Sequence, residues 1–174
     1  MKKYKFILIS LIFFIVVVFT FPELVKYLGY RLNTTKSMPR GIYKIETNSN
    51  IKTGDIVEIC LPDEKAKIGI ARGYIGDGSC PNNTTPLAKK VIAVPNDHVF
   101  MDAKGITVNE KFYDYPQITV DGWGREIPHY NLNEKISGYF VVGVTDKMSW
   151  DSRYFGVIPR ENIEGVLTPK YTES

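Results

Sequence analysis

The residues best suited to chemistry in this chain are one serine and two lysines. Ser37 precedes Met38-Pro39, and the proline restrains Met38 to an extended backbone, which holds the serine at a fixed turn. A serine hydroxyl is a weak nucleophile until a base accepts its proton, so Ser37 needs a partner. Without such a partner, the same tripeptide is typical of an ordinary turn.

Two adjacent lysines, Lys89 and Lys90, are the candidate bases. They lie in an apolar run, residues 87–94, where alternation gives both faces of a predicted strand hydrophobic neighbours. Burial disfavours an ammonium ion, so a buried lysine can be a neutral base near neutral pH. The alternative is that both ammonium groups extend from the strand into water. Periodicity does not choose between the two lysines.

A third polar cluster lies near the C-terminal end, where Ser149, Asp151 and Arg153 occur at alternate positions. Asp151 and Arg153 could form a charge-assisted pair that fixes a loop. A nearby hydroxyl could hydrogen-bond a neutral lysine and orient it. By itself, the cluster is equally consistent with a polar turn before Gly156.

The two histidines are weaker candidates. His98 falls inside a predicted strand and His129 lies in a polar loop without a nucleophile motif, so a Ser-His-Asp triad is not expected. No residues have metal-ligand spacing, and we expect neither a metal nor a cofactor. The two cysteines, Cys60 and Cys80, favour a disulfide over two free thiols if this part of the chain lies outside the cytoplasm.

The N-terminal end combines charge with an apolar run. Lys2, Lys3 and Lys5 precede the first acidic residue and account for the net charge of +3, so the rest of the chain is neutral. A neutral body lacks the basic stripe that binding to nucleic acid requires. Residues 6–21 carry no charge, and no small-residue cleavage site follows them, which favours a membrane anchor over a cleaved signal peptide. The lysines place the N-terminus in the cytoplasm.

The rest of the chain is predicted to be mostly β. All ten prolines and all fourteen glycines lie at or beyond position 22, which leaves little room for long helices. Two less regular stretches, residues 66–86 and 110–135, are expected to form long loops or a small inserted lobe. Residues 102–105 predict a hairpin turn. The predicted strands are residues 41–45, 55–61, 89–94, 98–101, 106–108 and 139–144.

In this order, the three clusters resemble the Ser-Lys signal peptidase I superfamily. A fourth box of that superfamily, a Gly-Asp pair followed by a hydrophobic strand, is also present. Any one box is a weak signal, but four in order behind an apolar segment are a strong one. The boxes are Ser37-Met38-Pro39, then Gly54-Asp55-Ile56-Val57, then Lys89-Lys90-Val91-Ile92-Ala93-Val94-Pro95-Asn96-Asp97, and finally Ser149-Trp150-Asp151-Ser152-Arg153-Tyr154-Phe155-Gly156.

Within the superfamily, the chain is most similar to the TraF-type conjugative-transfer peptidases, through residues 35–43, residues 71–74 ahead of Cys80-Pro81, and Ala93-Val94. The resemblance implies a signal-peptidase-like coiled β-sheet catalytic domain at residues 31–174, behind a single transmembrane helix within residues 1–30. It also implies a bacterial inner-membrane location with a periplasmic catalytic domain, and a propilin or another membrane-associated precursor as substrate.

By the same resemblance, Ser37 is the nucleophile and Lys89 the general base, which distinguishes the two lysines. Ser149 matches the hydroxyl that holds the base, Asp151 a catalytically implicated aspartate, and Arg153 its structural partner. The sequence departs from ordinary signal peptidases at residues 143–146 and at Asn96. Two alternatives stay open: a general signal peptidase that cleaves secretory precursors, and a membrane-anchored scaffold without catalytic activity.

Overall fold

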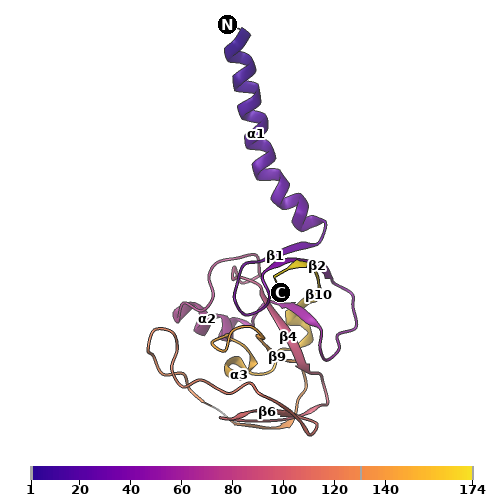
Figure 1. Cartoon of the computed structure of the whole chain (residues 1–174), viewed down its shortest axis with the longest axis vertical. Helices are drawn as coiled ribbons and strands as arrows, with labels where there is room; N and C mark the ends of the chain where they lie inside the picture. The colour runs from indigo at the N-terminus through magenta and orange to yellow at the C-terminus, as the bar shows by residue number, and fades with distance from the viewer. Residues whose placement is uncertain (1, 130, 174) are drawn as a thin grey trace.

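The computed structural model describes residues 2–129 and 131–173, and the side chains of these except residues 2, 3 and 6. It begins with one long helix, α1 (Lys2–Tyr27), of 26 residues and about 39 Å. The helix stands away from the rest of the chain (Figure 1), and its apolar part, Ile7–Tyr27, has a mean hydropathy of 2.6 with none of it buried. This confirms the predicted N-terminal apolar helix, long enough to span a membrane. The side chains of Lys2 and Lys3, on which the predicted orientation rests, lie outside the described part.

A six-stranded antiparallel sheet forms the centre of the body. Its strand order is β1-β2-β10-β3-β4-β9, so the strand nearest the C-terminus lies between strands from the first half of the chain. This architecture confirms a mostly β body. The strands are β1 (Tyr30–Asn33), β2 (Gly41–Glu46), β3 (Ile56–Ile59), β4 (Leu87–Ala93), β9 (Phe140–Val142) and β10 (Ile163–Thr172).

A second, four-stranded sheet lies at the end of the body farthest from α1 (Figure 1), in the order β7-β6-β5-β8. The predicted turn connects β5 and β6, with Asp102 paired to Gly105 and its carboxylate accepting a hydrogen bond from the Lys104 amide at 2.8 Å. Residues 110–135, predicted to be irregular, contribute two of the strands. These strands are β5 (His98–Asp102), β6 (Gly105–Val108), β7 (Lys111–Tyr113) and β8 (Leu132–Lys135).

The sequence did not predict β10. Gly165 and Pro169 interrupt the strand pattern in the sequence. Both lie where the pairing of β10 with its neighbours is irregular, because the register shifts between Ile163 and Gly165 and again between Pro169 and Tyr171. The helix α2 (Asp63–Ala71) was also not predicted and lies at the start of the first irregular stretch. Two shorter helical turns, α3 (Ser152–Phe155) and η1 (Arg160–Asn162), precede β10.

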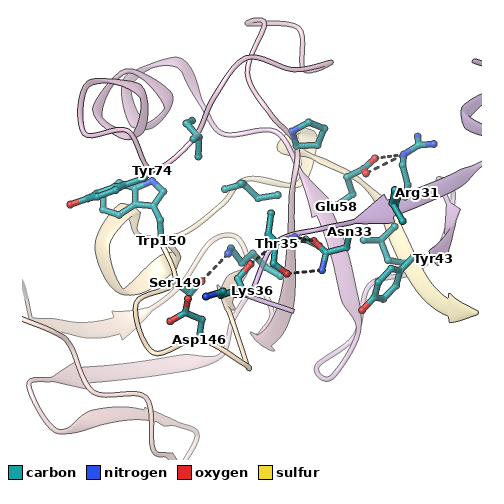
Figure 2. A pocket seen from close by; sticks show the side chains of 18 of the residues that line it. Arg31, Asn33, Thr35, Lys36, Tyr43, Glu58, Tyr74, Asp146, Ser149 and Trp150 are labelled. Carbon is teal, nitrogen blue, oxygen red and sulfur yellow. Dashed lines mark hydrogen bonds and ion pairs between the residues drawn. The ribbon is translucent and has the colours of Figure 1, made fainter. Parts of the chain in front are cut away.

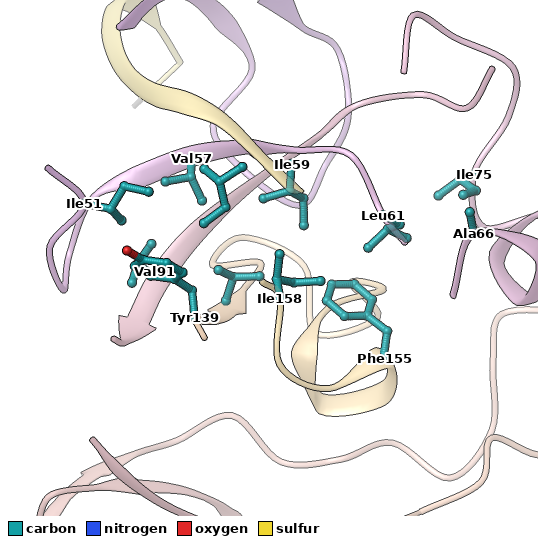
Figure 3. Close-up of a cluster of buried hydrophobic side chains, with 12 residues drawn as sticks. Ile51, Val57, Ile59, Leu61, Ala66, Ile75, Val91, Tyr139, Phe155 and Ile158 are labelled. Atoms are coloured by element: carbon teal, nitrogen blue, oxygen red, sulfur yellow. The ribbon is translucent and has the colours of Figure 1, made fainter. Parts of the chain in front are cut away.

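The main core cluster packs on one side of the large sheet (Figure 3). Burial of each large aliphatic side chain contributes roughly 1.5–3 kcal/mol to folding, so this cluster is the principal source of stability of the sheet. A second cluster joins β4 and β9 to the four-stranded sheet. The main cluster consists of Ile51, Val57, Ile59, Leu61, Ala66, Ile75, Val91, Tyr139, Val141, Phe155, Ile158 and Ile163.

Cys60 and Cys80 form a disulfide with a Cα–Cα distance of 5.6 Å, and both residues are buried. The bond closes a loop with a sequence separation of 20 residues that contains α2. It therefore fastens this segment to the end of β3.

Replacement of both cysteines by alanine is expected to lower the free energy of unfolding by about 3 kcal/mol, because the unfolded chain is no longer closed into a loop. Denaturant unfolding of the full chain in detergent measures this change. A reducing agent should destabilise the parent protein and leave the double variant unaffected. A double variant as stable as the oxidised parent would contradict this role of the disulfide.

Candidate active site

Ser37 lies in the turn between β1 and β2, which Asn33 at the end of β1 holds in shape. The side-chain nitrogen of Asn33, Nδ2, donates hydrogen bonds to the backbone carbonyls of Met38 and Pro39, both at 3.0 Å. Its oxygen accepts from the backbone and hydroxyl of Thr35, at 3.1 and 2.7 Å. Met38 is buried and anchors the turn in the body. Ser37 itself is half-buried, so its hydroxyl is fixed at the surface of a cavity.

Lys89 lies in β4 and is only 3% exposed. Its Nζ donates a hydrogen bond to the Ser149 hydroxyl at 2.8 Å. Burial lowers the pKa of Lys89 from its ordinary value near 10.5 to about 8; Arg153 adds to this lowering, while Asp151 and Asp146 oppose it. A substantial fraction of this amine is therefore neutral near pH 8. Lys90, its neighbour in the strand, is only half-buried. The two lysines, which periodicity could not distinguish, therefore differ in their burial.

The loop after β9 brings the serine and the lysine together. The strand before this loop, β9, pairs with β4, which carries Lys89. Within the loop, the Val144 amide donates a hydrogen bond to the Ser37 carbonyl at 2.8 Å. As a result, Ser37, Lys89 and Ser149 line one cavity of about 230 Å³. Figure 2 shows this cavity, with Trp150 at one end.

The Ser37 hydroxyl lies 3.3 Å from the Thr35 hydroxyl, its one hydrogen-bond partner within the described part of the chain. It is not hydrogen-bonded to Lys89 here, and catalytic hydrogen bonds are often long before substrate binds. The Ser37 backbone N–H also has no partner among the described residues, so it is available to a developing oxyanion.

Asp151 and Arg153 form a buried ion pair behind the lysine, with the Asp151 side chain fully buried and Arg153 only 1% exposed. Two hydrogen bonds, of 2.8 and 2.9 Å, join the guanidinium to the carboxylate. The carboxylate also accepts from the Gly143 amide at 2.9 Å and caps α3. None of its hydrogen bonds reaches Ser37 or Lys89. The structure therefore places Asp151, predicted to be catalytic, where it fixes the loop and acts on Lys89 through charge.

Gly143 leaves no room for a side chain. A Cβ atom there would lie 2.2 Å from the Ser149 hydroxyl oxygen and 3.1 Å from Ser37 Cβ. Both distances are too short for ordinary contacts, and Ser149 would have to move away from the lysine. The absence of a side chain at Gly143 thus permits the two serines to approach one another.

The histidines lie elsewhere. His98 is exposed on β5, and the ring of His129 lies 2.6 Å from the side-chain oxygen of Gln117. Neither residue lines the serine cavity, and the described residues contain no group of three or more potential metal ligands among His, Cys, Asp and Glu.

Among the cavity residues to which the sequence assigned no role in the site are Asn33, Thr35 and Asp146. Asn33 and Thr35 flank a turn, and a side chain of either type commonly bonds to backbone in turns, so the pattern was visible but not specific. Asp146 gave no such local signal, because its relation to Lys89 depends on the tertiary fold.

Substitution of Gly143 by alanine is expected to lower the free energy of unfolding by about 1–3 kcal/mol, because the added methyl group collides with Ser149. Denaturant unfolding measures the loss. Gly76→Ala is the matched control, since its Cβ would have no neighbour closer than 3.9 Å. Equal destabilisation by the two substitutions would show that crowding at Gly143 is not the cause.

Comparisons with known proteins identify relatives of this chain. The family model described as "Signal peptidase, peptidase S26" matches residues 1–171. A conjugal transfer protein TraF of Agrobacterium fabrum (strain C58 / ATCC 33970) is 31% identical over 149 residues, which cover 83% of each chain. A plasmid transfer protein TraF of Escherichia coli is 34% identical over 152 residues, also 83% of each chain.

Among solved structures, a signal peptidase I from Enterococcus faecalis V583 is 20% identical, with a TM-score of 0.40; the match covers 69% of this chain and 98% of that one. The family model and the relatives span most of the chain and confirm the resemblance seen in the sequence boxes. The chain belongs to the signal peptidase, peptidase S26, family.

Proposed function

We propose that this chain is a membrane-anchored serine endopeptidase in which Ser37 is the nucleophile and Lys89 the general base. The observation that carries the proposal is the buried amine of Lys89, with its pKa lowered to about 8, in the same cavity as the half-buried Ser37. A neutral amine can accept the serine proton, and a desolvated lysine is one of the few side chains able to do so without histidine.

The first half of the reaction forms an ester. Lys89 Nζ takes the proton of the Ser37 hydroxyl as Oγ attacks the carbonyl carbon of the scissile peptide bond. The Ser37 backbone N–H, which has no other partner among the described residues, donates to the oxyanion. Collapse breaks the carbon–nitrogen bond, and the Lys89 ammonium returns its proton to the leaving amine.

The second half releases the acyl group. Lys89 takes a proton from water as the water oxygen attacks the ester carbon; the bond from that carbon to Ser37 Oγ then breaks, and the Lys89 ammonium returns the proton to Oγ. The hydrogen bond from Lys89 to Ser149 keeps the amine directed at the cavity, so Ser149 is a positioning residue in both halves. An amine held close to the ester could replace water, because tethering gives it a high effective concentration. In that case the product is a cyclic or transferred peptide.

For the substrate, we propose a propilin processed during conjugative transfer. The proposal is supported by the relatives' names, which are conjugal or plasmid transfer proteins. The apolar helix α1 supports a membrane location, and the basic N-terminus supports an orientation with the catalytic body in the periplasm. The disulfide is consistent with that oxidising compartment.

Ser37→Ala and Lys89→Ala are each expected to reduce processing of the co-expressed pilin precursor by at least about 1,000-fold, because each removes a group that takes part in bond breaking. Lys90→Ala is the matched control and should process normally, since Lys90 does not line the cavity. Mass spectrometry of the product measures processing, and a product one water lighter than the linear segment indicates cyclisation. Full processing by either alanine variant at Ser37 or Lys89 would exclude the dyad.

The pH profile of cleavage is a further test. Lys89 must lose its proton to act as a base, so kcat/KM should rise as pH increases through about 8 and level off above it. The Asp146 carboxylate raises the pKa of Lys89, so Asp146→Asn should move this limb to lower pH. Asparagine can still accept the 2.8 Å hydrogen bond from the Met148 amide. A profile with no acid limb would contradict a lysine base.

A further inference from the structure

We infer that a second pocket beside the serine cavity is a subsite for one large apolar side chain of the peptide substrate. This inference rests on the proposed peptidase function and adds a determinant of specificity to it. The pocket, called here the aromatic pocket, has a volume of about 290 Å³. Its walls are mainly Tyr74, Ile118, Trp123, Ile127, Trp150 and Tyr154.

The aromatic pocket adjoins the serine cavity. Tyr74, Met148, Ser149 and Trp150 line both, and in Figure 2 Tyr74 and Trp150 lie at one end of the serine cavity. Ser149 is also the hydrogen-bond partner of Lys89, so the shared wall directly adjoins the proposed base. A peptide with its scissile bond at Ser37 therefore has a neighbouring side chain within reach of the aromatic pocket.

The inner wall of the pocket is held firmly. The ring of Trp150 stacks on that of Tyr154 with an interplanar angle of 7° and 5.8 Å between centroids. It also meets the edge of Phe155, at 5.9 Å. The Tyr154 hydroxyl accepts a hydrogen bond from the Ile118 amide at 2.9 Å. These contacts give the pocket its shape before any ligand binds, which reduces the entropic cost of binding.

The outer wall is an exposed aromatic side chain. Trp123 is 65% exposed and stacks on Tyr74, with 6.1 Å between the ring centroids. The guanidinium of Arg125 lies over both rings, 4.9 Å from the centroid of Trp123 and 5.7 Å from that of Tyr74. A large aromatic surface left in water beside an apolar pocket favours burial against an apolar ligand.

The charged groups around the mouth are already paired. The buried carboxylate of Asp121 accepts hydrogen bonds from Arg125 and from the Tyr74 hydroxyl, both at 2.7 Å, and from the Trp123 amide at 2.9 Å. It therefore joins two segments that are far apart in sequence into one rim. With its carboxylate engaged by these donors, the pocket offers apolar walls rather than a site for a charged side chain.

The volume sets the size of the occupant. About 290 Å³ is at the lower limit of cavities that hold small organic ligands, which suits one leucine-sized or aromatic side chain. Discrimination between a large and a small side chain in such a pocket is commonly about 10-fold or more in kcat/KM. The pocket thus selects among precursors by one residue near the cleaved bond.

Two variants alter the pocket in opposite ways. Gly122→Leu fills it, because a Cβ at Gly122 lies 3.3 Å from the terminal methyl of Met148, and both residues line the pocket. Trp123→Ala removes the outer wall. Two controls change residues that do not line either cavity: Gly76→Leu, whose Cβ would meet nothing closer than the Thr85 hydroxyl at 3.9 Å, and Phe112→Ala, an exposed aromatic on β7.

The experiment uses the full chain in detergent micelles and a library of peptides randomised on both sides of one peptide bond, with products read by mass spectrometry. Wild type is expected to prefer a large apolar residue at one position by about 10-fold over alanine in kcat/KM. Gly122→Leu and Trp123→Ala should each reduce that preference by about 10-fold, through a higher KM for the peptide with the large residue. The two controls should keep the wild-type preference.

The outcomes separate the two proposals. If wild type cleaves no peptide and a small acylating agent does not label Ser37, the peptidase function fails and the subsite fails with it. If wild type cleaves by way of Ser37 but both pocket variants keep the full side-chain preference, only the subsite is overturned. A preference lost equally in Gly76→Leu or Phe112→Ala would also overturn it.

Discussion

Burial of the Lys89 amino group is the constraint on which the rest of the site depends. An ammonium ion inside an apolar sheet is costly, so the surroundings favour the neutral amine and lower its pKa. A neutral amine still needs a hydrogen-bond partner, and the Ser149 hydroxyl at 2.8 Å supplies one. The neighbouring charges adjust this balance in both directions. The pKa of about 8 is therefore a property of the fold around β4 rather than of the lysine alone.

One buried ion pair ties together the segments behind this lysine. Asp151 and Arg153 are both almost completely buried, and each also bonds to a second segment: the carboxylate to the Gly143 amide, the guanidinium to the Pro116 carbonyl. Removal of either partner would leave a buried charge, which typically costs about 3–5 kcal/mol. The pair thus connects the loop beside Ser37 to the segment around Pro116, close in sequence to Ile118 in the wall of the aromatic pocket. A catalytic role of Asp151 itself stays a prediction.

The sequence predicted the strands whose apolar alternation is unbroken, such as β2, β5 and β6, to within a residue or so at each end. It overextended β9, because the Gly143 amide bonds to a carboxylate instead of a neighbouring strand. It missed β10, where Gly165 and Pro169 interrupt the pattern. Periodicity could not select between Lys89 and Lys90, since both faces of β4 are packed. The aromatic pocket was beyond reach, because its walls come from segments that only the tertiary fold brings together.

The junction between α1 and the body is short and tied on both sides. The Gly29 carbonyl accepts a hydrogen bond from the Ile45 amide at 2.9 Å, and Arg31 bonds both to the Lys26 carbonyl at 3.2 Å and to Glu58 at 2.9 Å. Ser37 lies only ten positions beyond the last residue of α1, a span of at most about 35 Å even if fully extended. A helix held in a bilayer would, through these contacts, set the distance between Ser37 and the lipid surface.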